Sequence, residues 1–538
     1  MKLRVIFTIT VVASVILMCT GIAISLYLRM SITEKAEDFN LYTVVPQSSV
    51  VILDTDDVVG LIKGVNELNC SKDNNFLYAS RLFSHLKDHI NTLLEDVPHG
   101  LSRQMSRLLI SFHEPGNDKD QVVYCRLGAG DHELVEKFIK TYCASDFPSK
   151  YFDYRGEEIR IYPVVGDEFL ACYFTSEFLA ISYQKKLIEE VIDARVYDTS
   201  ILNDETFLRL RAEKAMNSPA TVYFRMQPMN MGKESDGIPS PTILGNWTEF
   251  NMQMNGDAIY FSGVNYDQDT CVTFMNTLRK QAAIDGFPGE ILPYTTFFFS
   301  NWSISDLRSL FRFTSQHEYA RSTYSNYIME RDEELLDFLD NHAYHSLTTC
   351  FFSSPDSVHN SCAVVRIPIR NAKHAEQALT DLLQNVSWEK NMEYLPQAIF
   401  NWPYTFRLLP RNTLFTQLTG VTGSGLQLYS TFYRGQLLIG SSLESLSAYI
   451  SMINAGEVLA GDYMYEKCVG SLSDSYNFMM MADLQQVFGQ PESYVRLIPN
   501  FFFLHHEFFC NFMFSTQFTC IDGVIYPNIV LLYKGQSN

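Results

Sequence analysis

The residues best suited to chemistry in this chain are two aspartates that follow an apolar run. In "VVILDTDDVVG", residues 50–60, Asp54 and Asp56 are separated by a single threonine. A carboxylate at the end of a buried strand can attack a phosphorus atom, and a second carboxylate nearby can act as general acid and base. Mg²⁺ would neutralise the charge that develops on the phosphate. The spacing therefore raises the hypothesis of a metal-dependent phosphatase that uses Asp54 and Asp56.

The other parts of such an enzyme are not evident downstream. The D-x-D stretch resembles the first motif of haloacid-dehalogenase-type phosphatases, which also need a Ser or Thr after a second strand, a lysine and a further acidic pair. Asp167 and Glu168 in "VVGDEFLACYF" do not lie at the C-terminal end of a strand. The phosphatase is therefore the alternative interpretation and not the leading one.

Ser182 and Lys185 satisfy the S-x-x-K pattern of penicillin-recognising enzymes. The S-D-N and K-T-G companions of that pattern are missing from the chain. A polar start of a helix is therefore the favoured interpretation of the two residues.

Histidines occur at spacings that can serve a metal ion. His85 and His89 are one helical turn apart, as are His342 and His345, and such pairs can chelate Zn²⁺ when a third ligand arrives. Neither pair has the H-E-x-x-H glutamate, so polar faces of amphipathic helices are the favoured interpretation. We assign no catalytic, cofactor-binding or metal-binding residue from the sequence.

An aromatic segment near the C-terminus combines rings with titratable groups. It reads "FFFLHHEFFCNF", residues 501–512, and contains His505, His506 and Glu507. Adjacent residues point apart on a helix or a strand, so these three do not form a ligand set. We expect the phenylalanines to fill a core, and the alternative is an exposed aromatic ledge for a lipid or protein partner.

Composition excludes one large class of partner. The chain has 538 residues, 46% of them hydrophobic, and carries 41 Lys+Arg against 61 Asp+Glu for a formal charge of -20. A strongly acidic protein repels phosphate backbones, so nucleic acid is not expected as a partner. The length and apolar content favour at least two domains.

The cysteines do not form a recognisable framework. Of the 11 cysteines, most lie between apolar or aromatic residues, as in "VVYCRL" and "LACYF", and no C-x-x-C pair occurs. Buried thiols that behave as small hydrophobic side chains are the favoured interpretation, and one or two disulfides remain an alternative.

One segment predicts a membrane anchor. Residues 5–28 contain no charged side chain, and a helix of that length crosses a hydrocarbon layer of about 30 Å. Lys2 and Arg4 precede the span, which favours a cytoplasmic N-terminus of residues 1–4. The apolar run is too long for a typical cleaved signal peptide. We therefore expect an uncleaved single-pass anchor, with the remainder of the chain outside the cytoplasm.

The region after the anchor carries an internal similarity. Four pairs of stretches recur in the same order: those from residues 45 and 292, 178 and 436, 218 and 474, and 248 and 516. The last pair places Asn255-Gly256 and Asp522-Gly523 between alternating strands, which predicts a hairpin in each copy. This pattern predicts a tandem duplication.

The duplication provides an internal control for the aspartates. It places Asn301 opposite Asp54 and Ser303 opposite Asp56. Asn and Ser cap helices as Asp does, but neither can serve as an attacking carboxylate. We therefore expect Asp56 and Ser303 to cap the helices that follow them.

The sequence predicts an α+β fold with mainly antiparallel sheets, preceded by a transmembrane helix. The expected parts are a cytoplasmic N-terminus at 1–4, the anchor at 5–28, a linker at 29–44, a first α+β repeat at 45–285 and a second at 286–538.

The single span and the "VILDTDD", "FLAIS…LIEEVI" and "IDGVIYPNIVLLYK" stretches resemble a family of bacterial membrane-anchored envelope proteins of unknown function. The resemblance implies an envelope location and adds no activity. Together with the predicted span, it leads us to expect a single-pass protein of the bacterial inner membrane with its C-terminal region in the periplasm. The leading expectation is a non-enzymatic protein that binds or scaffolds an envelope component and has no cofactor. A phosphatase is one alternative, and a carrier of an apolar ligand is the other.

Overall fold

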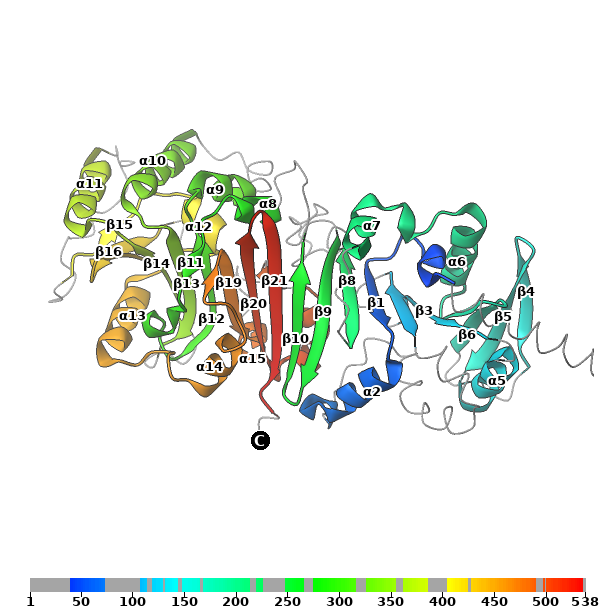
Figure 1. The fold of residues 1–538 in the computed structure, drawn as a ribbon. Coiled ribbons are helices and arrows are strands. Elements are labelled where there is room, and N and C mark those ends of the chain that lie inside the picture. Colours follow the sequence, from blue (N-terminus) through cyan, green and yellow to red (C-terminus); the bar gives the residue numbers. More distant parts are fainter. Residues whose placement is uncertain are drawn as a thin grey trace, which may run out of the picture. The chain divides into compact units, whose positions relative to one another are not determined.

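The computed structural model describes residues 39–72, 107–113, 119–128, 131–143, 148–164, 168–212, 219–225, 247–265, 274–315, 326–354, 361–385, 404–423, 427–489, 497–498 and 500–535. These residues form a mixed α+β fold with a large, mainly antiparallel sheet, as the sequence predicted (Figure 1). None of the described helices has the length and apolar character needed to cross a membrane. The span predicted at residues 5–28 lies outside the described residues.

The chain divides into two units. The first comprises residues 1–65 and 78–223, and the second comprises residues 66–77 and 224–538. Strands β9 (Trp247–Asn255) and β10 (Ala258–Val264) belong to the second unit, although the predicted first repeat includes them. The repeat boundary at residue 285 stays a prediction.

The strands of the first unit follow the order β8-β1-β2-β3-β7-β6-β5-β4. The pairs from β1 to β4 along this order are antiparallel. The bounds are β1 (Val51–Thr55), β2 (Leu108–Phe112), β3 (Gln121–Arg126), β4 (Lys150–Tyr154), β5 (Glu157–Val164), β6 (Glu168–Phe174), β7 (Phe178–Ser182) and β8 (Ala220–Arg225).

Side chains alternate between two covered faces of this sheet. Leu108 and Ile110 pack in a buried cluster with Val58 of α2 (Val58–Glu67) and Val135 of α5 (Asp131–Phe138). The intervening residues of β2 point to the opposite face, because neighbours on a strand alternate. Helix α6 (Lys185–Tyr197) covers that face through contacts with β3, β6 and β7. The unit also contains η1 (Leu41–Val44), the π-helical turn η3 (Ile139–Cys143), η4 (Ile201–Asn203) and α7 (Glu205–Ala212).

The strands of the second unit follow the order β9-β10-β21-β20-β19-β12-β13-β14-β17-β16-β15, with each neighbouring pair antiparallel. Their further bounds are β12 (Thr296–Ser303), β13 (Ser346–Ser353), β14 (Ser361–Pro368), β15 (Arg407–Leu408), β16 (Tyr429–Tyr433), β17 (Gln436–Gly440), β19 (Phe478–Asp483), β20 (Phe512–Ile521) and β21 (Val524–Tyr533). A separate pair joins β11 (Ile284–Asp285) to β18 (Ser475–Tyr476).

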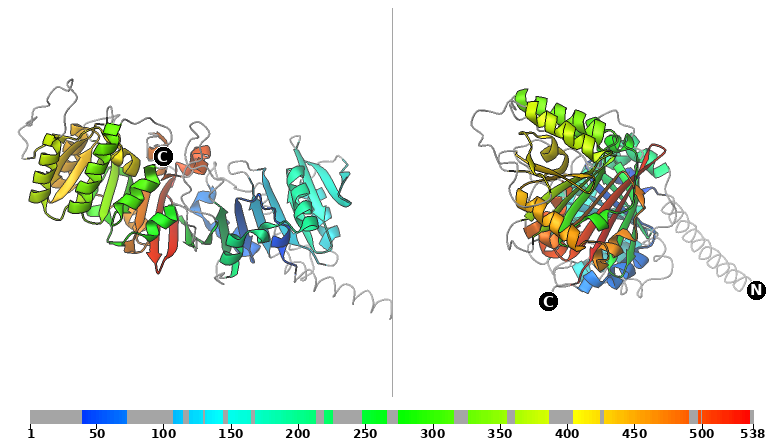
Figure 2. Two further views of the ribbon diagram at one scale, coloured as in Figure 1. Left: turned by 90° about the horizontal axis from the view of Figure 1, so that it is seen from above. Right: turned by 90° about the vertical axis from the view of Figure 1, so that its left-hand side faces the viewer.

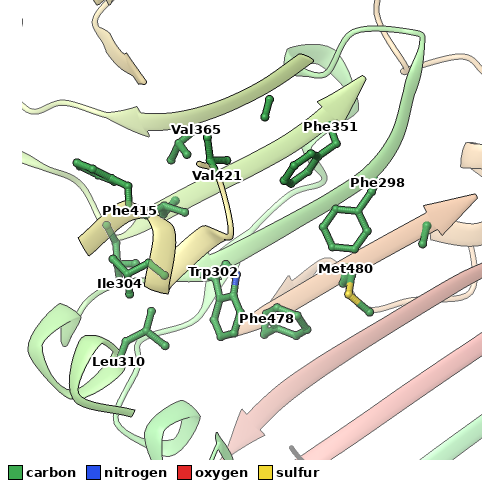
Figure 3. Close-up of a cluster of buried hydrophobic side chains, with 14 of the residues drawn as sticks. Phe298, Trp302, Ile304, Leu310, Phe351, Val365, Phe415, Val421, Phe478 and Met480 are labelled. Carbon is green, nitrogen blue, oxygen red and sulfur yellow. The ribbon is translucent and has the colours of Figure 1, made fainter. Parts of the chain in front are cut away.

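Helices lie on both faces of this second sheet (Figure 2). Phe298 and Trp302 belong to one buried cluster, which includes residues of α9 (Leu307–Ser315), α10 (Asn326–His342), α11 (Ala372–Asn385) and α12 (Leu414–Thr419) (Figure 3). Phe299 belongs to a second cluster with α13 (Leu443–Ala455) and α14 (Tyr463–Val469). Each face of β12 therefore has its own core.

The remaining helices of the second unit are η2 (Asn69–Lys72), α8 (Phe274–Arg279), η5 (Pro288–Ile291), α15 (Leu484–Gly489), α16 (Asn500–Leu504) and α17 (His506–Phe509).

Both predicted hairpins are present. Ile521 pairs with Val524, so Asp522 and Gly523 form the two-residue turn, and both have positive φ as a type I′ turn requires. In the other hairpin Asn255 pairs with Ala258, so the turn residues are Gly256 and Asp257. The predicted Asn255-Gly256 turn is therefore wrong by one residue, because Asn255 is the last ladder residue.

The capping prediction is also displaced. Asp57, and not Asp56, accepts a hydrogen bond at 2.8 Å from the backbone N–H of Gly60 in the first turn of α2. In the second unit Asp306, and not Ser303, accepts from the backbone N–H of Ser309 at 3.1 Å. Ser303 is buried and donates its hydroxyl proton to the carbonyl of Ala282. An aspartate caps both helices, one residue and three residues after the expected positions.

Candidate functional site

The register of β1 and β2 brings Arg107 to the two candidate aspartates. Thr55 at the end of β1 pairs with Leu108 at the start of β2. Arg107 therefore lies next to the point where β1 ends. Its guanidinium is 3.2 Å from the Asp54 carboxylate and 3.3 Å from the Asp56 carboxylate.

The two carboxylates have different environments. The Asp54 side chain is 1% exposed and that of Asp56 is 67% exposed, with Arg107 between them at 24%. The hydroxyl of buried Tyr42 donates a hydrogen bond of 2.7 Å to Asp54. Burial, with the Asp54 charge second, raises the pKa of Tyr42 well above its usual value, so this phenol keeps its proton. Burial lowers the pKa of Arg107, but the charges of Asp54 and Asp56 outweigh it and raise that pKa.

This arrangement stabilises the fold and does not favour a phosphoryl-transfer centre. A nucleophilic aspartate must be reached by substrate, whereas Asp54 is buried against Tyr42 and Arg107. The arginine supplies the positive charge that Mg²⁺ would supply in a phosphatase. Glu168 is the first residue of β6 and pairs with Lys119, and Asp167 lies outside the described residues.

A second polar cluster on the α6 side of the same sheet has no counterpart in the sequence predictions. The side chain of His113, directly after β2, contacts one serine through each ring nitrogen. The Ser48 Oγ lies 2.9 Å from Nδ1, and the Ser111 Oγ lies 2.9 Å from Nε2. The chain continues from Ser48 to the Glu190 carboxylate of α6 at 2.8 Å and from Ser111 to the hydroxyl of Tyr124 at 3.1 Å.

The direction of these hydrogen bonds follows from the number of protons. Ser48 donates its single proton to Glu190, so it can only accept from the Nδ1–H of His113. The Nε2 of His113 then accepts from Ser111, which accepts in turn from Tyr124. Burial lowers the pKa of His113 to about 4 and raises that of Tyr124, so both groups are neutral near pH 7.

This relay, from Tyr124 to Glu190, fixes a neutral imidazole in one tautomer. It does not prepare Ser48 for nucleophilic attack, because His113 presents an N–H to Ser48 and not a lone pair. Its five members come from four separate places in the chain, since only Ser111 and His113 are close in the sequence. The sequence contains no spacing signal that could have revealed it.

Acidification is expected to destabilise the first unit through His113. An unfolded histidine binds a proton near pH 6.5, whereas the folded His113 does so at about 4. The unfolded state therefore binds more protons between these values, and the free energy of unfolding falls as the pH is lowered through them. The loss is at most about 3 kcal/mol, and smaller to the extent that water reaches the half-buried ring.

Urea unfolding followed by circular dichroism, repeated between these pH values, measures this slope. His113→Gln keeps one donor and one acceptor but cannot titrate, so the free energy of unfolding of the variant should fall less steeply with pH than that of wild type. His506→Gln, in the second unit, is the matched control and should keep the wild-type slope. Equal slopes in wild type and His113→Gln would contradict the assignment.

The S-x-x-K pair has structural contacts. Ser182 is buried, donates to the carbonyl of Gln121 at 2.7 Å and accepts from the backbone N–H of Gln184 at 3.0 Å. Lys185 forms an ion pair with Glu189, one turn along α6. The serine hydroxyl and the lysine are therefore not joined, and the polar helix start is confirmed.

The histidine pairs do not form metal centres in the described part of the chain. Helix α10 ends at His342, so His345 is not on its next turn as predicted, and the His342 ring instead lies 5.1 Å from that of His374. His85 and His89 lie outside the described residues. Among the residues that the structure describes, no group of three or more His, Cys, Asp or Glu side chains is placed to hold a metal ion.

The aromatic segment fills a core, as expected. Phe502, Phe508, Phe509 and Phe512 are buried in the cluster that contains Trp302. His505 precedes α17, and His506 faces the ring of Phe488 at 6.4 Å. The aromatic ledge is therefore wrong for these four phenylalanines.

Eight cysteine side chains are described by the structure. Six are buried and two are of intermediate exposure: Cys70, Cys125, Cys172, Cys350, Cys362 and Cys468, and Cys510 and Cys520. The interpretation as buried thiols is confirmed for those six.

Comparisons of the chain with models of known protein families, with curated proteins and with solved structures found no match. The proposals below therefore depend on the residues and contacts of this chain alone.

Proposed function

We propose that this chain is a non-enzymatic, membrane-anchored envelope protein that binds or scaffolds another component through its first unit. The observation that carries the proposal is the edge strand β4. Among the described strands, β4 pairs with β5 alone, and its burial pattern is exposed along almost the whole strand. Exposed aromatic rings on a strand edge are typical of binding surfaces.

The exposed rings of β4 lie on both faces of the sheet. Tyr151 is 57% exposed and Phe152 is 43% exposed. The Arg160 guanidinium lies 5.4 Å from the Tyr151 ring centre, and the Lys185 ammonium lies 5.4 Å from that of Phe152. These cations hold the rings in place, which reduces the entropy that a binding partner must remove.

The Arg107 contacts support the non-enzymatic interpretation over the phosphatase. They leave Asp54 buried in an ion pair, where it serves stability. The location remains a proposal that rests on the apolar run at residues 5–28: a single span in the bacterial inner membrane, with the region after it in the periplasm.

We further propose that the two units descend from a duplication. The order β8-β1-β2-β3-β7-β6-β5 corresponds to β19-β12-β13-β14-β17-β16-β15. Helices α6 and α13 both have 13 residues, and each ends in a left-handed residue, Asp198 or Gly456. Equivalent backbone bonds follow: the N–H of Ile201 donates to Val45, and that of Leu459 donates to Leu292.

The strand registers support the same alignment. We align β7 with β17 and then follow the residue pairings from strand to strand in each unit. This aligns β3 with β14, β2 with β13 and β1 with β12. The last step places Asp54 opposite Asn301. Asn301 is also buried, and it donates to the hydroxyl of Tyr476 at 2.9 Å. The same path places buried Phe352 opposite His113. The ion pair and the relay are therefore features of the first unit that the shared strand order does not require.

Photocrosslinking in intact membranes tests the binding function. A benzophenone amino acid at position 152 is expected to give adducts of higher mass, because this side chain is exposed on the proposed surface. The matched control is position 463, where Tyr463 is 71% exposed in the second unit and should give few adducts. Absence of adducts at 152 would overturn the proposal, as would a Mg²⁺-dependent phosphatase activity of the full chain that Asp54→Asn abolishes.

A further inference from the structure

We infer that β4 pairs in antiparallel fashion with β4 of a second copy of this chain. The inference rests on the proposed binding function and names the partner of the same surface. It is carried by the backbone of the β4–β5 hairpin and by the order of side chains along "KYFDY".

The hairpin determines which peptide groups of β4 are available. Tyr154 pairs with Glu157 across the two-residue turn Arg155-Gly156, whose residues both have positive φ. The pair that closes such a turn exchanges hydrogen bonds, and hydrogen-bonded pairs then alternate along the ladder. Phe152 and Lys150 are therefore bonded to β5. The N–H and C=O groups of Tyr151 and Asp153 point away from it.

In an antiparallel pair, two residues that lie opposite each other either both direct their N–H and C=O groups toward the partner strand or both direct them away. An added strand must therefore place outward-pointing residues opposite Tyr151 and Asp153. Between two copies of β4 this leaves three registers. Asp153 opposite Asp153 places like charges together, which is unfavourable. Tyr151 opposite Tyr151 aligns Asp153 with residue 149, outside the strand. Tyr151 opposite Asp153 overlaps all five residues and satisfies both outward-pointing residues of each copy.

The complete-overlap register also joins complementary side chains. Phe152 then lies opposite Phe152 of the second copy in a non-hydrogen-bonded pair, the geometry that brings side chains closest. Lys150 lies opposite Tyr154 of the second copy, whose hydroxyl donates to Asp193 at 3.1 Å. The Lys150 ammonium of each copy thus approaches the Asp193 carboxylate of the other copy, so the contact forms twice.

The opposite face gains from the same pairing. Within one copy, Asp153 lies directly across from Glu158, whose carboxylate already pairs with Arg160 at 2.8 Å. The second copy adds its Tyr151 on the other side of Asp153, together with the Arg160 that covers that ring. The KYFDY strand is therefore complementary to a second KYFDY strand that runs in the opposite direction. This complementarity favours a second copy of the chain over an unrelated strand as the partner.

The interface is small, since it is built around five residues on each side. Interfaces of this size are weak in free solution. Attachment of both copies to one membrane would raise their effective concentration. Trapping by a disulfide is therefore a better test than the mass of the free protein.

Phe152→Cys in the full chain, purified in detergent and oxidised with copper phenanthroline, is expected to form a dimer linked through position 152. Facing residues of a non-hydrogen-bonded pair have Cα atoms about 4.5 Å apart, which a disulfide spans. Peptide mass spectrometry identifies the link. Wild type and Tyr463→Cys, made in the same way, report background from the native cysteines and from exposed positions.

A matched pair of second changes tests the backbone bonds. Added to Phe152→Cys, Tyr151→Pro removes an outward N–H and leaves the bonds to β5 in place, and it should reduce trapping about tenfold, because two hydrogen bonds are lost by symmetry. Tyr151→Ala keeps the N–H and should retain most of the trapping. Hydrogen exchange in β5 verifies that the hairpin persists in both variants.

Trapping of Phe152→Cys no greater than that of Tyr463→Cys would overturn the inference, as would equal trapping with Tyr151→Pro and Tyr151→Ala. The photocrosslinking described above separates this failure from failure of the binding function. Adducts at 152 that contain only a different protein would refute self-pairing and leave binding intact. A complete lack of adducts would refute binding itself.

Discussion

Replacing Arg107 by methionine is expected to destabilise the first unit by about 3 kcal/mol or more. The change removes the cation that lies 3.2 Å from Asp54 and keeps much of the apolar side chain. The Asp54 carboxylate, 1% exposed, would then stay buried with the Tyr42 hydroxyl but would lose the charge of Arg107. Removing one partner of a buried ion pair costs far more than the pair contributes, because the remaining charge has lost its hydration.

Urea unfolding followed by circular dichroism would give this loss, and hydrogen exchange in β1 and β2 would locate it. The informative control is Arg107→Met combined with Asp54→Asn, which removes both charges and imitates the neutral Asn301 of the second unit. We expect the double variant to regain most of the lost stability. A loss below about 1 kcal/mol for Arg107→Met would show that the pair behaves as an exposed one.

Local sequence patterns predicted the elements of this fold well. Apolar runs of five to eight residues became the strands β1, β12 and β17, and the N-G and D-G signals correctly indicated two hairpins. The burial of the aromatic segment at residues 501–512 followed from its composition. These features depend on neighbouring residues, whose periodicity reports directly on one buried face.

The sites depend on residues that are distant in the sequence, and they were missed for that reason. Arg107 reaches Asp54 only because β1 and β2 pair with Thr55 opposite Leu108. The relay at His113 needs the same pairing together with the docking of α6. Displacement of the caps to Asp57 and Asp306 has a different cause, since the strand before each helix continues further than the polar residues indicated.

Comparison of the two units was more informative than any motif. The strand pairings place Asn301 at the position of Asp54, as the sequence comparison predicted, whereas the choice between a binding protein and a phosphatase stays a prediction. The same comparison distinguishes the edge of the first sheet. Strand β15 takes the place of β5 in the strand order and has two residues, whereas β5 has eight and pairs with β4.

Replacing Phe478 by alanine is expected to destabilise the second unit by about 3 to 5 kcal/mol. Phe478 pairs in register with Trp302 on β12 and with Phe518 on β20, so one row of rings crosses three strands. Its ring lies beside that of Trp302, with the ring centres 4.3 Å apart (Figure 3). The ring centre of Phe518 lies 5.8 Å away. Rigid strands on both sides prevent collapse of the cavity, which places the loss at the upper end for a buried phenylalanine.

Tryptophan emission during urea unfolding measures this effect directly, because all four tryptophans of the chain lie in the second unit. Phe478→Leu preserves most of the volume and should cost less than about 1.5 kcal/mol. Tyr463→Ala, at a side chain that is 71% exposed, should stay within about 0.5 kcal/mol of wild type. If Phe478→Ala lost no more stability than Phe478→Leu, the prediction would be wrong. The strands around position 478 would then collapse into the cavity, and the row of rings would not be the centre of this core.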